Sequence, residues 1–416
     1  MARWFTTTFA ALRIRNFRLL WIGSLLAFAA FFMSTVVQSV VAFDLTGNNS
    51  SVGVVVFAQG VAQTILGPLG GAMADRASRR KVILACQLLI TAAFIFLAVL
   101  IGLDRVTILL LAVGSFAIGS AFSFLGPSRQ AFAIDLVGGQ QRGNAMALNQ
   151  VAFNAGRIIG PLLGGAFLAI AILGATGAYV GMAAFYVLAV TTTLLLPEIP
   201  AAGVQRRSIL GDIAGGIQYV AHDPALRVLV LSFFIVMMVG FPYVTVLPGM
   251  LENELGRDSK DVSILYGATA VGGLIASLSV AAMADSPRAN TVYRAAGFGF
   301  GVSLLLAAVS PGFAVLALVM FGLGATSGAF QTLNGAIIAH LAEPAFLGRV
   351  MSLTFMAFAG FQLIALPIGV FADAAGERAT LAVMGGVVCL AIVVFALMPA
   401  HSAGRPHATV AVEAES

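Results

Sequence analysis

The 416-residue chain is 60% hydrophobic and only 9% charged, with a mean hydropathy of +1.01. A soluble globular domain carries about 25% charged residues, so this composition excludes that class and predicts a polytopic membrane protein. The two cysteines, Cys86 and Cys389, lie inside apolar runs and predict small core residues without a disulfide framework.

Twelve apolar runs follow a basic N-terminus that contains Arg3, Arg13, Arg15 and Arg18. About 20 residues of helix cross a hydrocarbon core of about 30 Å, so each run predicts a membrane-spanning helix. The first run is too long for the apolar segment of a cleaved signal peptide. The predicted spans cover approximately residues 19–43, 52–74, 82–103, 106 to the 130s, 144–172, 178–196, 226–249, 262–284, 290–309, 313–340, 350–373 and 379–399.

A polar stretch at 197–225 interrupts this series. Within it, Ile209, Ile213 and Ile217 recur at helical spacing, which predicts an amphipathic linker helix at the cytoplasmic face rather than a span. The predicted domains are an N-terminal six-helix half at 1–196, the linker at 197–225, a C-terminal six-helix half at 226–400 and a disordered cytoplasmic tail at 401–416.

The basic residues predict the orientation in the membrane. Sixteen of the 22 Arg and Lys residues fall on the side that carries both termini, four fall on the other side, and Arg129 and Arg157 lie within runs. Loops rich in Arg and Lys stay in the cytoplasm, so both termini are expected there. Lys81 and Lys260 are the only lysines, a bias typical of GC-rich bacteria, and we expect a multi-pass protein of a bacterial plasma (inner) membrane.

The most informative segment lies between the second and third runs and reads Gly71-Ala-Met-Ala-Asp75-Arg76-Ala-Ser-Arg79-Arg80-Lys81. Each cation would cost about 2.5–3.5 kcal/mol at the bilayer centre, which predicts an aqueous cytoplasmic turn. The residue order resembles the loop between helices 2 and 3 of the major facilitator superfamily, except that Ser78 replaces a usual glycine. The resemblance implies a conformational-switch loop made of Gly71, Asp75, Arg76, Arg79 and Arg80; an ordinary positively charged loop is the alternative.

Asp75 is the residue to which this resemblance assigns a specific role. In the superfamily, helices 2 and 11 meet when the cytoplasmic side is closed, and the eleventh run is expected to begin near Arg349. Asp75 would then latch the two halves by capping the N-terminus of that helix. The alternative is that Asp75 pairs with Arg76 or Arg79 inside its own loop.

The two halves of the chain repeat one another. The sequence Ala-Met-Ala-Asp occurs at 72–75 and again at 282–285, and Met351 and Pro367 match Met146 and Pro161 at a similar offset. Two parallel repeats with a substrate site between them at mid-depth are typical of this transporter class. The predicted fold is therefore an all-α polytopic membrane protein with twelve transmembrane helices in two six-helix parallel repeats, the major facilitator fold.

The fourth and fifth runs narrow the resemblance. Gly126-Pro-Ser-Arg129-Gln130 and Gly156-Arg157-Ile-Ile-Gly160-Pro161 resemble the exporter branch that includes the enterobactin exporter and macrolide-efflux proteins. That branch implies a gradient-driven, proton-coupled, alternating-access exporter (an antiporter) of an amphipathic small molecule such as a drug or siderophore. An importer of a small solute is one alternative, and a non-transporting receptor or scaffold is another. Residues 114–119 lack the arginine usual in drug–proton antiporters, which leaves a sodium route open.

The fifth run also carries a packing motif. Small residues at i, i+4 and i+8 let another helix approach closely, and a proline permits a bend. Such small-residue faces are common in bundles, so a purely structural role is the alternative. The motif consists of Gly156, Gly160, Pro161, Gly164 and Gly165.

Mid-membrane polar residues are the candidates for the substrate cavity. Arg157 is the deepest charge, and a cation there usually faces a water-filled cavity or the bundle interior. It is predicted to bind an anionic group or perturb a titrating partner, with a structural tie as the alternative. The amides either line the cavity or cross-link helices. The full candidate set is Gln38, Gln59, Gln63, Asn154, Arg157, Gln331, Asn334 and Gln362.

Carboxylates that could carry a coupling proton all lie near the ends of runs. Asp44, which ends the first run, is the preferred candidate and Asp135 the second. A solvated charge at a helix end is the alternative for these two and for Glu252, Glu254 and Asp373.

Gly-x4-Gly-Lys-Ser/Thr is absent from the sequence, so we expect no ATP-hydrolysing or other enzyme activity. The energy would come from a gradient, since one charge crossing 100 mV supplies about 2.3 kcal/mol. The predicted partners are a small-molecule substrate, a coupling proton and membrane lipid, without nucleic acid, metal or cofactor, and the chain is expected to be a monomer.

Overall fold

The computed structural model describes residues 10–138, 141–170, 172–199, 209–281, 283 and 286–398. Twelve helices in these ranges are long and apolar enough to cross a membrane, which confirms the predicted helical fold class. The second copy of the Ala-Met-Ala-Asp repeat and the C-terminal tail fall mainly outside the described residues.

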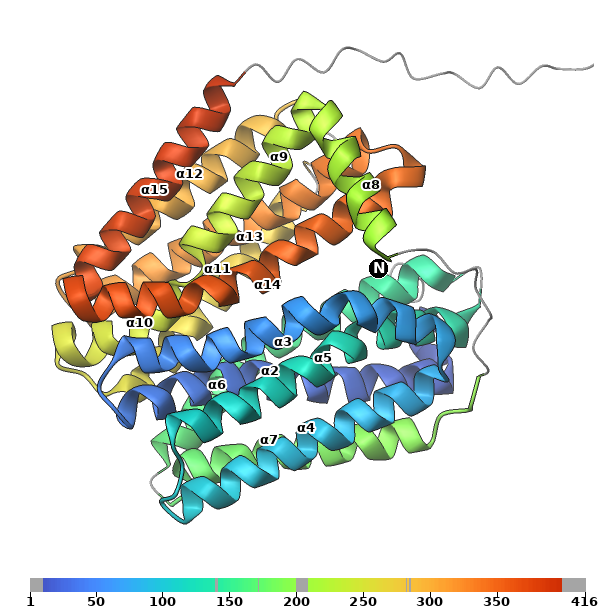
Figure 1. Ribbon diagram of the computed structural model, residues 1–416, viewed down its shortest axis with the longest axis horizontal. Coiled ribbons are helices and arrows are strands. Elements are labelled where there is room, and N and C mark those ends of the chain that lie inside the picture. Colours follow the sequence, from blue (N-terminus) through green and yellow to red (C-terminus); the bar gives the residue numbers. More distant parts are fainter. Residues whose placement is uncertain are drawn as a thin grey trace, which may run out of the picture.

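The N-terminal half is one six-helix bundle, drawn in blue to green in Figure 1. Its closest helix pairs are α3 with α5, α2 with α6, and α4 with α7. Its elements are η1 (Ala10–Arg13), α2 (Arg15–Asp44), α3 (Asn49–Arg76), α4 (Arg79–Gly102), α5 (Ile108–Val137), α6 (Arg142–Ala169) and α7 (Gly174–Leu194).

The C-terminal half repeats this arrangement in yellow-green to red (Figure 1). The pairs α11 with α13 and α12 with α15 are the counterparts of α3 with α5 and α4 with α7. Its elements are α9 (Pro224–Ile235), η3 (Val236–Gly240), α10 (Tyr243–Gly249), η4 (Met250–Glu254), η5 (Ser259–Asp261), α11 (Val262–Ala281), α12 (Ala289–Ala308), α13 (Phe313–Leu341), α14 (Pro344–Ala375) and α15 (Glu377–Leu397).

The seventh span is not the continuous helix that its apolar run suggested. Two π-helical turns, η3 and η4, flank the short helix α10. Pro242 and Pro248 lie in this region, and each lacks the backbone N–H that a regular α-helical ladder requires. Insertions of this kind in a helix occur frequently at functional sites.

The basic segment 71–81 is largely helical, so the predicted turn was too long, while its aqueous cytoplasmic position stays a prediction. Helix α3 continues to Arg76 and α4 begins at Arg79, leaving only Ala77 and Ser78 between them. The charges are accommodated at helix ends. Arg79 forms an ion pair with Asp135 at the end of α5, and Arg80 donates to the Leu194 carbonyl at the C-terminus of α7, where a cation is favourable.

The up-and-down path gives the bundle two ends, here named the Asp44 end and the Arg79 end after residues at their first turns. Figure 1 shows that the two halves converge at the Asp44 end and diverge toward the Arg79 end. At the Arg79 end, α8 (Ile209–His222) packs on α14. The ring of Tyr219 stacks on that of Phe346 with centroids 4.3 Å apart. This short helix lies within the predicted linker, whose cytoplasmic position stays a prediction.

Candidate functional site between the two halves

A carboxylate at the Asp44 end joins the two halves. The Asp373 side chain, in the last turn of α14, accepts hydrogen bonds from the backbone N–H groups of Asn49 (2.7 Å) and Ser50 (3.0 Å). These donors open α3, whose own preceding residue provides no side-chain cap. The first turn of a helix has unpaired N–H groups and a positive dipole end, so an anion stabilises it.

Two further contacts reinforce this junction. Glu377 is 5% exposed, and its Oε1 accepts from the side-chain amides of Asn49 (2.9 Å) and Asn253 (2.7 Å). The hydroxyl of Ser259 in the C-terminal half donates to Asp44 Oδ1 at 2.6 Å. We call the five residues Asp44, Asn49, Ser259, Asp373 and Glu377 the Asp44-end latch.

Glycines allow α3 and α14 to approach closely behind the latch. A Cβ on Gly53 would lie 2.8 Å from the Ala365 carbonyl oxygen, and one on Gly369 would lie 2.6 Å from that of Asn49. These glycines were not among the residues predicted from the sequence. The spacing of Gly53 and Gly60 by seven residues places them on one face of α3 and was the available signal.

About halfway along α3, an amide pair links the halves. Gln362 Nε2 of α14 donates to Gln63 Oε1 of α3 at 3.0 Å. Both are candidates from the sequence, and the fold brings them together although 299 positions separate them. Their contact therefore joins α3 of the N-terminal half to α14 of the C-terminal half at mid-length of α3.

Arg157 lies at mid-depth on α6, about 22 Å along the helix from Arg142. Its side chain is partly exposed. Tyr243 of the opposite half lies within electrostatic range of its guanidinium, and among the described residues Arg157 forms no ion pair and no hydrogen bond. Tyr266, whose hydroxyl donates to the Val244 carbonyl at 3.1 Å, adds a second phenol near Tyr243.

Three other amide candidates are each buried within their own half, away from the junction. Gln38 accepts from the Ser115 hydroxyl at 2.8 Å within the N-terminal bundle. Asn334 donates to the Tyr293 hydroxyl at 3.3 Å within the C-terminal bundle. Gln59 is also buried, on the face of α3 that meets α5.

The two remaining amides are partly exposed. Asn154 accepts from Gln150 at 3.4 Å, and Gln331 donates to the Ser327 carbonyl at 3.2 Å. The fold therefore brings Gln63, Gln362 and Arg157 to the junction of the halves. Substrate contact by any candidate stays a prediction.

The switch-loop candidates divide into two groups. Arg79 and Arg80 hold α4 against α5 and α7 through the contacts given above. Gly71, Asp75 and Arg76 lie in α3 but outside the residues whose side chains the structure describes, so the predicted Asp75 latch stays a prediction.

The glycine motif of α6 packs directly on α2. A Cβ on Gly156 would lie 2.6 Å from Phe28 Cβ, and one on Gly160 would lie 2.6 Å from the Ala29 carbonyl oxygen. Gly165 faces the other half, where its Cβ would collide with the Ser263 hydroxyl. Pro161 lies within α6 without ending it.

Gly160→Ala should destabilise the protein by about 1–3 kcal/mol, because the added methyl has no room beside α2. Gly164→Ala is the matched control, since its Cβ would lie at an ordinary distance of 3.4 Å from the Met33 carbonyl oxygen. Thermal unfolding in detergent would compare the two. Equal melting temperatures for the two variants would contradict this packing.

Arg129 of α5 is a residue whose environment the sequence did not predict. It is 2% exposed, and among the described residues its guanidinium nitrogens have no hydrogen-bond acceptor. Its guanidinium carbon lies 5.6 Å from the ring centroid of Phe28, and Tyr186 and Cys86 lie within electrostatic range of it. These neighbours all belong to the N-terminal bundle, so Arg129 lies away from the junction of the halves.

Comparison with known families decides the class of protein. The model of a family described as transmembrane secretion effector matches residues 6–408. The chain belongs to this family. The match spans both halves and supports the resemblance to exporters of the major facilitator superfamily.

Curated relatives of the chain are bacterial exporters at low identity. The multidrug efflux pump Tap of Mycolicibacterium fortuitum is 26% identical, with 80% of this chain and 83% of that protein covered. Macrolide efflux protein A of Streptococcus pyogenes is 24% identical, with 91% of this chain and 95% of that protein covered. The enterobactin exporter EntS of Shigella boydii is 26% identical, with 74% of this chain and 73% of that protein covered.

Solved structures confirm the fold. A mutant of the nucleoside transporter NupG matches with a TM-score of 0.75 at 17% identity, covering 92% of this chain and 99% of that one. The family and the structural neighbours are transporters, so the chain is a multi-pass membrane transporter and not an enzyme.

Proposed function

We propose that the protein is a gradient-driven, alternating-access exporter of an amphipathic small molecule such as a drug or siderophore. The observation that carries the proposal is the Asp44-end latch in a chain whose relatives are efflux pumps. The latch consists of polar contacts between the halves, and such contacts can break without unfolding either bundle. A second conformation, closed at the Arg79 end and open at the Asp44 end, would then expose Gln63, Arg157 and Gln362 to the opposite side of the membrane.

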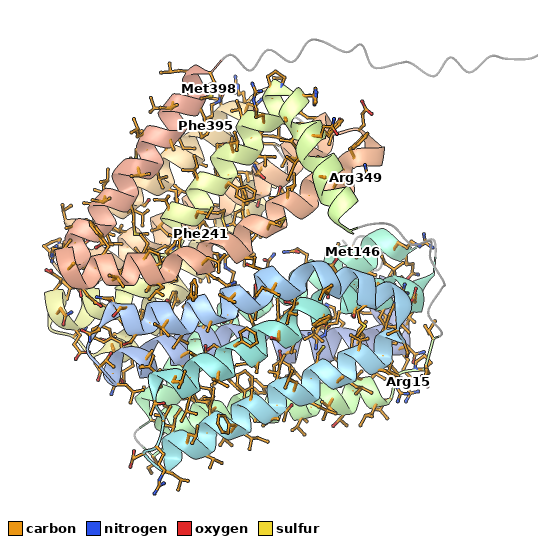
Figure 2. All side chains as sticks on the ribbon, in the orientation of Figure 1. Arg15, Met146, Phe241, Arg349, Phe395 and Met398 are labelled. Atoms are coloured by element: carbon orange, nitrogen blue, oxygen red, sulfur yellow. The ribbon has the colours of Figure 1, made fainter. Side chains whose placement is uncertain are left out.

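The charge distribution supports the orientation of this cycle. Arg79, Arg80, Arg142 and Arg349 lie toward the Arg79 end, in keeping with a cytoplasmic position. Figure 2 labels Met146 and Arg349 on opposite halves at this end, where the ribbons diverge. On this proposal the state described is inward-facing and would take cargo from the cytoplasm.

A cysteine-labelling experiment tests this orientation. In a variant with Cys86 and Cys389 replaced by alanine, Asn48→Cys should react with an impermeant thiol reagent in intact cells, whereas Gln218→Cys should react only after lysis. Both positions are exposed in the structure. The reverse labelling pattern would overturn the assignment.

The direction of transport is tested in cells. A deletion strain would be grown with varied toxic compounds and under iron starvation, and the intracellular content of each affected compound would be measured. Export predicts a higher content in the deletion strain than in the parent. A lower content would indicate import, and no change for any compound would favour a receptor or scaffold.

A further inference from the structure

The middle of the membrane contains positive but no negative side-chain charge. All 17 acidic residues lie close to the end of a span or outside the spans, whereas Arg129 and Arg157 lie well inside α5 and α6. An arginine keeps its charge in essentially any protein environment. Any carboxylate that neutralises these two cations must therefore come from beyond the middle of the bundle.

The two arginines differ in what can reach them. Arg129 is enclosed in the N-terminal bundle beneath the Phe28 ring. Arg157 is partly exposed, lies within electrostatic range of the buried Tyr243 of the other half and has no hydrogen-bond acceptor among the described residues. A guanidinium in this position presents a fork of N–H donors that matches a carboxylate or another planar anion.

We propose that Arg157 binds a negatively charged group of the cargo, with Tyr243 as its partner across the junction, so that the exporter selects anionic amphiphiles. This inference rests on the proposed function and adds the class of substrate. The cargo would carry a carboxylate, an acidic phenol or a sulfonate on an apolar body. A cationic amphiphile would meet Arg157 without a carboxylate to offset the repulsion.

This placement also ties binding to conformational change. Arg157 belongs to the N-terminal half and Tyr243 to the C-terminal half. An anion between them would contact both halves, and its binding free energy would differ between conformations in which the two residues are close and apart. Such a difference is what allows a ligand to shift a conformational equilibrium.

The test uses purified protein in liposomes and two xanthene dyes of similar size and opposite charge. Carboxyfluorescein is the anionic probe and tetramethylrhodamine ethyl ester the cationic probe. Wild-type protein should bind and transport carboxyfluorescein in preference to tetramethylrhodamine ethyl ester. Arg157→Gln should weaken carboxyfluorescein binding about tenfold or more, the range expected for lost hydrogen bonds to a charged group. Arg157→Lys should retain part of it.

Arg129→Gln is the matched control, because it removes the other mid-membrane arginine without touching the junction. It is expected to leave the preference between the dyes unchanged. Preference of the wild type for the cationic dye, equal carboxyfluorescein binding by wild type and Arg157→Gln, or no carboxyfluorescein binding would overturn the inference. Anionic binding that depends on Arg157 without gradient-driven flux would uphold the inference and reject the exporter.

Discussion

Asp373→Asn is expected to shift the protein toward the conformation open at the Asp44 end. The substitution nearly keeps the side-chain shape but removes the anion from the N-terminus of α3, where it accepts two backbone N–H groups. A charge at a helix end contributes about 0.3–2 kcal/mol. A loss near the upper limit changes the ratio of the two conformations by about thirtyfold, since 1.4 kcal/mol corresponds to tenfold.

Spin labels at Leu103 and Val309 would measure this shift. Both residues are exposed, and they follow α4 and α12 at the Asp44 end of opposite halves. The distance distribution of Asp373→Asn should gain a longer component. Asp104→Asn, which removes a carboxylate at the same end outside the latch, is the control. A distribution identical to that of the wild type would show that Asp373 does not hold the halves together.

Asp44→Asn is expected to abolish gradient-driven efflux while cargo exchange between preloaded vesicles continues. Asp44 is the acidic residue of the latch in the N-terminal half, and its contact with Ser259 crosses to the other half. If proton binding at this carboxylate accompanies opening of the latch, an uncharged amide removes the coupling but leaves the cargo site intact. Ser259→Ala is a useful companion, because it breaks the hydrogen bond and preserves the carboxylate.

Flux in proteoliposomes under an imposed pH gradient, and exchange without a gradient, would separate the two effects. Unchanged active efflux in Asp44→Asn would exclude this residue as the proton carrier. Attention would then move to Asp135, which is held in an ion pair by Arg79, or to a sodium gradient.

The spans were predictable because a bilayer demands long apolar helices with all backbone groups paired, and this demand is local in sequence. The length of the turn in the basic segment 71–81 was overestimated, because the sequence shows only the local charge density. That charge density favoured a loop. In the fold, however, Arg79 pairs with Asp135 and Arg80 donates to a carbonyl at the end of α7, and both partners are distant along the chain.

The latch depends on contacts that no local pattern encodes. The sequence left Asp373 either as a possible proton carrier or as a solvated helix-end charge, yet it caps α3 from a position 324 residues away. Glu377 is buried between two asparagine amides and had no signal in its own segment. By contrast, Gln63 and Gln362 were identified singly as mid-membrane amides, and only the fold shows that they meet.

The direction of flux tests the exporter most directly. Everted membrane vesicles, acidified inside by an imposed gradient, would be compared with right-side-out vesicles for accumulation of a compound identified in the deletion strain. An exporter driven by protons predicts accumulation in the everted vesicles that collapses when the gradient is dissipated. Accumulation confined to right-side-out vesicles would contradict export and establish an importer on the same fold.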